Sequence, residues 1–81
     1  MGVQVIARVE CRSEGAAEQH PIAVWLGRDR IEVGELISDV VEGPVEAGRP
    51  AMRRVRARLV DGQVFEFRRE LPRGEWWVYR D

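Results

Sequence analysis

The chain has 81 residues, 44% of them hydrophobic and 33% charged, which is enough for one small folded domain and too hydrophobic for a disordered chain. Its net charge of −1 argues against a generally basic nucleic-acid-binding protein. Its single cysteine excludes an intrachain disulfide framework and a cysteine-based metal cluster.

Charge is unevenly divided along the chain. Residues 1–48 carry 4 Arg against 9 Asp and Glu, whereas residues 49–81 carry 9 Arg against 5. In a small β fold the two halves interleave, so we expect the charges to neutralise one another across strands. No run of apolar residues is long enough to span a membrane, and the first residues lack the basic start of a signal peptide. We therefore expect one soluble, cytoplasmic domain over residues 1–81.

The first third of the chain predicts two strands. Apolar residues stand at every second position over residues 3–11, with Ile6 as the one exception, and this pattern is typical of a half-buried strand. Cys11 continues its apolar face and is predicted to be a small hydrophobic residue of the core. Residues 13–20 are small and polar and predict a loop, and residues 22–26 predict the second strand.

A turn at residues 27–30 leads into residues 31–41, which are predicted to form a hairpin with the preceding strand. Gly34 interrupts the alternation and indicates a bulge or bend. A helix over residues 35–42 is the competing interpretation, but the β-branched content favours a strand. Residues 43–50 contain two glycines and two prolines and predict a loop.

The most regular segment, residues 53–69, predicts a β-hairpin. A two-residue turn at Asp61-Gly62 would mix apolar and charged residues on both faces. A three-residue loop over residues 60–62, with Gly62 left-handed in a bulge, gives one apolar face instead. That register places Ala57 opposite Phe65, Val55 opposite Phe67, and Arg56 opposite Glu66.

A turn at residues 71–74 and a last strand over residues 75–80 complete the chain. The fold class is therefore all-β: a single small domain of five to six antiparallel strands in a barrel-like or strongly bent sheet.

Several short patterns resemble, in order and spacing, a family of small uncharacterised bacterial β-domain proteins. The matching positions are Val9-Glu10-Cys11, Pro21, Val24, Leu26-Gly27, Arg30, Val33, Glu35-Leu36-Ile37, Asp61-Gly62, Phe65, Phe67-Arg68, Trp76 and Val78. Three positions where that family has an aromatic residue carry Val24, Ile31 and Val40 here. The resemblance implies a compact β domain and supplies no functional residue.

Two groups of residues are candidates for an interaction site. Counting along the strands puts Trp25, Trp77 and Tyr79 on the face opposite the core, where they form either a covered second layer or an exposed protein-binding patch. The arginines Arg54, Arg56, Arg58 and Arg68 form a strip that could follow phosphates. Phe65 and Phe67 lie on the opposite face of that hairpin and cannot stack bases beside it.

Metal binding and catalysis are less well supported by the sequence than an interaction site. His20 stands alone before Pro21 and is predicted to be a solvated loop residue, so we expect no metal ion and no other cofactor. Cys11 has only His20 as an available base, and no spacing selects a pair of carboxylates. We predict no catalytic residues and a non-enzymatic module that binds another protein or itself. RNA or single-stranded DNA binding is the alternative, and an enzyme with an unrecognised carboxylate site comes third.

Overall fold

A computed structural model describes residues 2–14, 18–43, 48–71 and 74–81, and confirms an all-β domain. Its seven strands, one more than the upper expectation, are all antiparallel: β1 (Val3–Val5), β2 (Arg8–Glu14), β3 (Glu18–Leu26), β4 (Asp29–Glu42), β5 (Met52–Leu59), β6 (Val64–Glu70) and β7 (Trp76–Arg80). In the described part of the chain, no helix is long and apolar enough to cross a membrane.

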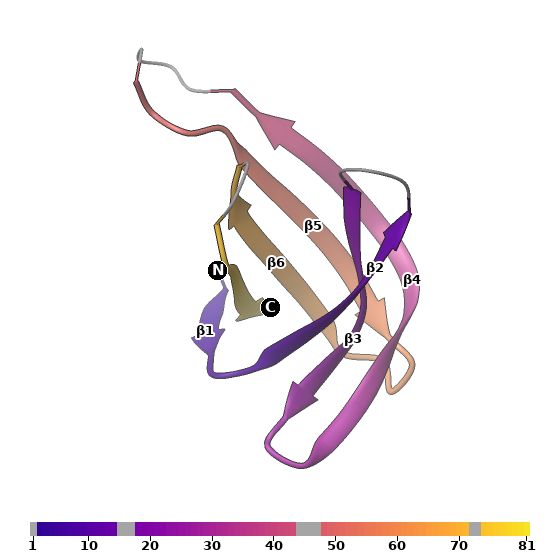
Figure 1. Ribbon diagram of the computed structural model, residues 1–81. Helices are drawn as coiled ribbons and strands as arrows, with labels where there is room; N and C mark the ends of the chain where they lie inside the picture. The colour runs from indigo at the N-terminus through magenta and orange to yellow at the C-terminus, as the bar shows by residue number, and fades with distance from the viewer. Residues whose placement is uncertain (1, 15–17, 44–47, 72–73) are drawn as a thin grey trace.

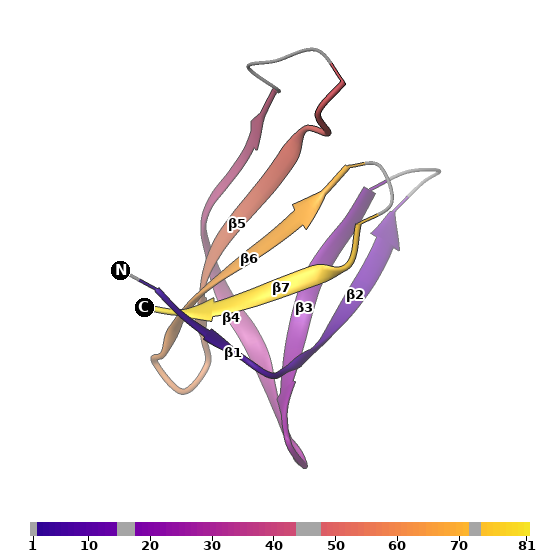
Figure 2. The same ribbon diagram turned by 90° about the vertical axis from the view of Figure 1, so that its left-hand side faces the viewer.

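The sheet curls into a half-barrel. Its strand order is β1-β7-β6-β5-β4-β3-β2, so β1 and β2 stand at opposite ends of the order. Only Ile6 and Ala7 separate these two strands along the chain, and the sheet must therefore bend until its ends approach each other. Figure 1 shows the β2–β3 hairpin crossing in front of β5 and β6, and Figure 2 shows β1 and β7 at the near side.

Four expectations about single elements can be compared with the structure. The strand predicted over residues 3–11 is two strands, bent at Ile6-Ala7. The loop predicted over residues 13–20 is largely strand, because β2 continues to Glu14 and β3 begins at Glu18; residues 15–17 lie outside the described residues. The helix alternative over residues 35–42 is wrong, since this segment belongs to β4. The bulge expected at Gly34 is confirmed by a register shift between Val33 and Glu35.

The β5–β6 hairpin has the predicted register. Ala57 lies opposite Phe65, Val55 opposite Phe67, and Arg56 opposite Glu66. Gly62 has a φ of +96°, and its N–H donates to the carbonyl of Leu59 at 2.9 Å, as a three-residue bulged loop requires.

The core lies on the inner, concave face of the curl. Its fully buried members come from strands on both sides of the curl: Val24, Val55, Ala57, Leu59, Phe65, Phe67 and Val78. The Phe67 ring meets the Trp76 ring edge-on, with 6.4 Å between centroids. Closing the sheet therefore brings the apolar faces of β3, β5, β6 and β7 together, and the outer face is left for polar and interacting side chains.

Candidate interaction surface

The four predicted arginines lie on the outer face of β5 and β6, opposite the core. Each of them has a carboxylate partner: Arg54 pairs with Glu42 and Glu66, Arg56 with Asp81, Arg58 with Glu35, and Arg68 with Glu66. Arg56 and Glu66 are opposite each other in the ladder, as predicted, but an ion pair expected from that position is not formed: Arg56 pairs with Asp81, and Glu66 with Arg54 and Arg68. The positive strip is neutralised by cross-strand partners from β4, β6 and the end of the chain.

Glu66 holds two of these arginines. Burial opposes its ionisation, but hydrogen bonds from Arg68 at 2.6 Å and from Arg54 at 3.3 Å outweigh that effect and lower the pKa of its carboxyl group. Glu66 is therefore a carboxylate at neutral pH. It supplies a fixed negative charge in the middle of the strip.

Two of the three predicted aromatic residues, Trp77 and Tyr79, lie beside these arginines. β7 pairs with β6, so Trp77 lies opposite Arg68 and Tyr79 opposite Glu66 on the outer face. The Arg68 guanidinium carbon is 4.2 Å from the centroid of the Tyr79 ring, a cation–π contact. Tyr79 is half-buried and Trp77 is 52% exposed, so the patch is only partly covered.

Trp25, the third predicted aromatic, is half-buried on β3 and held by charged neighbours. Its indole N–H donates to Glu10 at 3.2 Å, and the Arg8 guanidinium lies 5.0 Å from its ring centroid. Arg30 also binds Glu10, at 2.7 Å. The hydrogen bond from Arg30, followed by that from Trp25, lowers the pKa of Glu10 to about 2.

Three hollows form a series on the surface from β5 and β6 to β3, and each shares two lining residues with the next. The first, of about 320 Å³, is lined by Gln4, Met52, Arg68, Glu70, Trp77 and Tyr79. The second, of about 220 Å³, is lined by Gln4, Val5, Ile6, Ala7, Glu75, Trp76, Trp77 and Val78. The third, of about 400 Å³, is lined by Ile6, Ala7, Arg8, Trp25 and Gly27. We call this series the Trp77 surface; it contains all three predicted aromatic residues.

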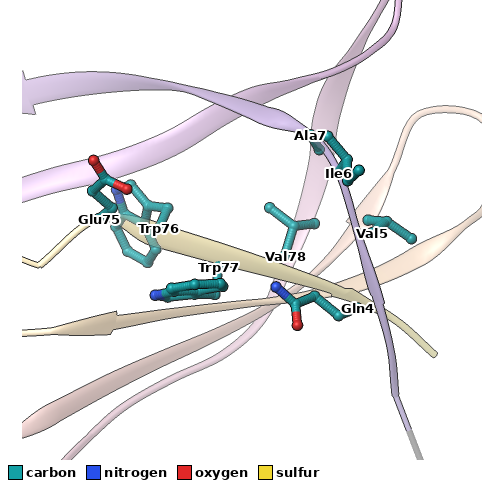
Figure 3. A pocket seen from close by; sticks show the side chains of 8 residues that line it. All are labelled: Gln4, Val5, Ile6, Ala7, Glu75, Trp76, Trp77 and Val78. Atoms are coloured by element: carbon teal, nitrogen blue, oxygen red, sulfur yellow. The ribbon is translucent and has the colours of Figure 1, made fainter.

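The second hollow lies where the bend at Ile6-Ala7 turns away from β7. β1 pairs with β7 only as far as Val5 opposite Val78, and the next residues of the chain turn away. Figure 3 shows the bend with Ile6 and Ala7 passing above β7, with Val78 directed toward it and Trp77 on the other side of the β7 ribbon. Gln4 lines the hollows on both sides of Trp77.

Ile6 is the functional candidate that the sequence analysis missed. Its side chain is fully exposed and lines both the second and the third hollow. The sequence did carry a signal, since Ile6 is the one apolar residue out of phase in the alternation of residues 3–11. A large apolar side chain at such a position points away from the core.

A separate polar cluster lies on the inner face. Arg53, only 7% exposed, donates to both carboxylate oxygens of Asp39 at 3.0 and 2.8 Å and lies 3.3 Å from His20 Nδ1. The hydrogen bond from Arg53 lowers the pKa of Asp39, against the opposing effect of burial. His20 is therefore not the solvated loop residue that was predicted, because it is part of β3 and contacts a buried arginine.

Cys11 and the possible metal ligands are further candidates for a site. Cys11 is half-buried, and burial raises the pKa of its thiol, which reduces the fraction of reactive thiolate. Among the residues that the structure describes, no group of three or more His, Cys, Asp or Glu side chains could hold a metal ion.

Comparison of the chain with protein-family models, with curated proteins and with solved structures found no match in any of the three. The resemblance to a family of small bacterial β-domain proteins stays a prediction.

Proposed function

We propose that this domain is a non-enzymatic protein-interaction module and that the Trp77 surface is its binding face. The observation that carries the proposal is the half-exposed Trp77 side chain, which lines two neighbouring hollows. Tryptophan is enriched among the residues that dominate binding energies, and it acts where neighbouring side chains exclude water around it.

The lining of the hollows fits a partner segment that presents apolar side chains. Trp77 and Ile6 offer apolar area, while Gln4, Glu70 and Arg68 supply polar groups near the first hollow. An apolar centre with a polar rim is the usual anatomy of a protein–protein interface. An extended segment that places successive side chains in the three hollows is the occupant we expect.

The ion pairs oppose the alternative, nucleic-acid binding. Unpaired cationic side chains bind a phosphate backbone because they neutralise its charge and release the counterions condensed on the nucleic acid. Arg54, Arg56, Arg58 and Arg68 already have carboxylate partners, so phosphate would have to displace carboxylates that lie on the same face. We expect no saturable binding of single-stranded RNA or DNA at low salt.

Selection from a phage-displayed library of random peptides tests the proposal. The domain is the bait, and one enriched peptide is then titrated into isotopically labelled protein. We expect chemical-shift changes to concentrate at Gln4, Ile6 and the indole N–H groups of Trp25 and Trp77. Ile6→Ser and Trp77→Ala should each weaken the peptide at least about tenfold, the loss expected of a hot-spot residue.

Val60→Ser is the matched control, because Val60 is also a well-exposed apolar residue, lies in the β5–β6 loop and lines none of the three hollows. It should leave the affinity unchanged. The proposal fails if no peptide is enriched over a Trp77→Ala bait, or if the shifts map to other strands. Salt-sensitive binding of a single-stranded oligonucleotide that is lost in Arg54→Gln would favour the nucleic-acid alternative instead.

A further inference from the structure

The charged side chains that line the Trp77 surface differ in whether this chain already supplies their partners. Arg68, in the first hollow, contacts both a carboxylate and an aromatic ring. Glu70, Glu75 and Arg8 are exposed, and none of the three forms an ion pair with the described residues. Glu70 lines the first hollow, Glu75 the second and Arg8 the third. A bound partner would therefore meet these three charges directly.

The three charges are separated by sign along the series of hollows. Figure 3 shows Glu75 at one end of the second hollow and the bend at Ile6-Ala7 at the other. The third hollow shares only the bend with the second, and Arg8 follows the bend in the sequence. The surface is therefore acidic in its first two hollows and basic in the third, and the apolar side chains of Trp77 and Ile6 lie between.

Glu10, the carboxylate nearest to Arg8 in the sequence, is bound to other donors. Its two oxygens accept hydrogen bonds from Arg30 at 3.1 and 2.7 Å, and one oxygen also accepts the Trp25 indole N–H. The Arg8 guanidinium lies over the Trp25 ring and donates no hydrogen bond to any described residue. Its N–H donors are therefore available to a carboxylate that enters the third hollow.

Building on the proposed peptide-binding function, we propose that the partner segment has an apolar centre, a basic residue at one end and an acidic residue at the other. The apolar centre would lie against Trp77 and Ile6. The basic residue would lie beside Glu70 and Glu75, and the acidic residue would bind Arg8. Complementary charges of both signs select such a segment over one whose ends have the same charge.

A uniformly charged partner fits this surface poorly. A phosphate backbone or an anionic membrane would bring like charge to Glu70 and Glu75, and a polybasic segment would bring like charge to Arg8. The separation of sign also sets the direction in which a given segment lies, because reversal would place each charged end beside its own sign. The Trp77 surface therefore discriminates among apolar segments by the charges at their ends.

A double-mutant cycle between Arg8 and the acidic residue of a selected peptide tests the proposal. The peptides come from the phage selection described above, and titration calorimetry at low and high salt measures their affinities. We expect enriched peptides to carry one basic and one acidic end. Arg8→Gln should weaken such a peptide about two- to fivefold, as expected for an exposed ion pair, and should not weaken a peptide whose acidic residue is replaced by its amide.

Two further variants separate charge from shape. Arg8→Lys keeps the positive charge and should retain most of the affinity. Glu75→Gln should weaken the original peptide and should not weaken one whose basic residue is replaced by glutamine. Both couplings should shrink at high salt, because exposed charges are screened.

Arg28→Gln is the matched control, because Arg28 is also exposed, forms no ion pair with the described residues and lines none of the three hollows. It should leave both affinities unchanged. Enriched peptides without ends of opposite charge, or equal weakening of both peptides by Arg8→Gln, would overturn this inference and leave the Trp77 surface as a binding face.

Two other outcomes would overturn the inference for a different reason. If no peptide is enriched over a Trp77→Ala bait, the proposed function fails and the charge preference fails with it. If the Trp77 indole signal shifts with protein concentration in the absence of peptide, the occupant is a second copy of the chain instead.

Discussion

β5 and residues 33–42 of β4 are neighbouring strand segments, but their apolar side chains are buried to different extents. In β5, Val55, Ala57 and Leu59 are buried, and the residues between them are polar and outward. In β4, Leu36 and Val41 are more than half exposed although they are on the same inner face of the sheet as Val55 and Ala57. β5 has a strand on each side and β2–β3 across from it, whereas β4 loses β3 after Glu32.

The difference shows that hydrophobicity alone does not determine burial in a sheet this small. A residue becomes core when strands on both sides and a facing layer exclude water from it. An equally apolar residue outside that cover keeps its exposed area available for binding. Substitutions that treat the two strands alike should therefore have unequal effects.

The largest effect is expected for Phe67→Ala in the hairpin, set against Val40→Ala in the part of β4 that does not pair with β3. Phe67 is fully buried and packs edge-on against Trp76, so its truncation should cost about 3–5 kcal/mol of the free energy of unfolding. Val40→Ala should change it by less than about 0.5 kcal/mol. Urea denaturation measures both values, and similar losses would remove the distinction between the two strands.

A smaller loss is expected for Gly62→Ala, in the loop that joins β5 to β6. At a φ of +96° a side chain is strained even though open space surrounds the position, so the cost should be about 1–2 kcal/mol. Gly43→Ala, beyond the end of β4, is the control, because Gly43 also has open space around it but no positive φ. Equal melting temperatures for the two variants would contradict the strained-loop explanation.

Acid should weaken the attachment of the covering hairpin to β4. Glu10 on β2 binds Arg30 on β4 and accepts a hydrogen bond from Trp25, and its folded-state pKa of about 2 is below the ordinary value of 4.5. A lowered folded-state pKa means that the stabilisation is present above pH 4.5 and is lost as the pH falls toward 2. Glu10→Gln should flatten this dependence of the urea midpoint on pH. An unchanged dependence would show that other carboxylates cause it.

The smallest effect on stability is expected at Trp77, the exposed aromatic neighbour of the buried Val78. Trp77→Ala should change the free energy of unfolding by less than about 1 kcal/mol, since half of the side chain is already in water. Thermal unfolding followed by circular dichroism measures this change. A large loss would mean that Trp77 is a structural residue, and the binding argument would then lose its basis.

The sequence predicted the features that depend on the local pattern of apolar and polar residues. The alternation of Val55, Ala57, Phe65 and Phe67 around Gly62 was sufficient for the hairpin and its register, because a one-residue slip would have mixed the faces. It did not reveal that β1 pairs with β7, which places Gln4 opposite Tyr79 at the edge of the Trp77 surface. These two strands lie at opposite ends of the sequence, and pairing between strands so far apart leaves no local signature.

The exposure of Leu36 and Val41 was equally hidden, since an apolar residue in an alternating strand reads as core whatever its neighbours are. Ile6 had a detectable signal in its phase, but only the structure connects it to Trp25 on one side and Trp77 on the other. The candidate site is therefore a tertiary property assembled from six strands, β1, β2, β3, β5, β6 and β7. Its three aromatic residues were predicted from the sequence, whereas Ile6 and the continuity of the surface were not.

The bend at Ile6-Ala7 also has a consequence for the order of folding. Because β1 pairs Val3 with Arg80, the curl closes only when segments about as far apart as this chain allows have met. Contacts of such high sequence separation carry the greatest loop-closure entropy and form late. We expect the β5–β6 hairpin to be structured in the folding transition state and the β1–β7 pairing to form after it, so that changes in β1 accelerate unfolding and leave the refolding rate almost unchanged.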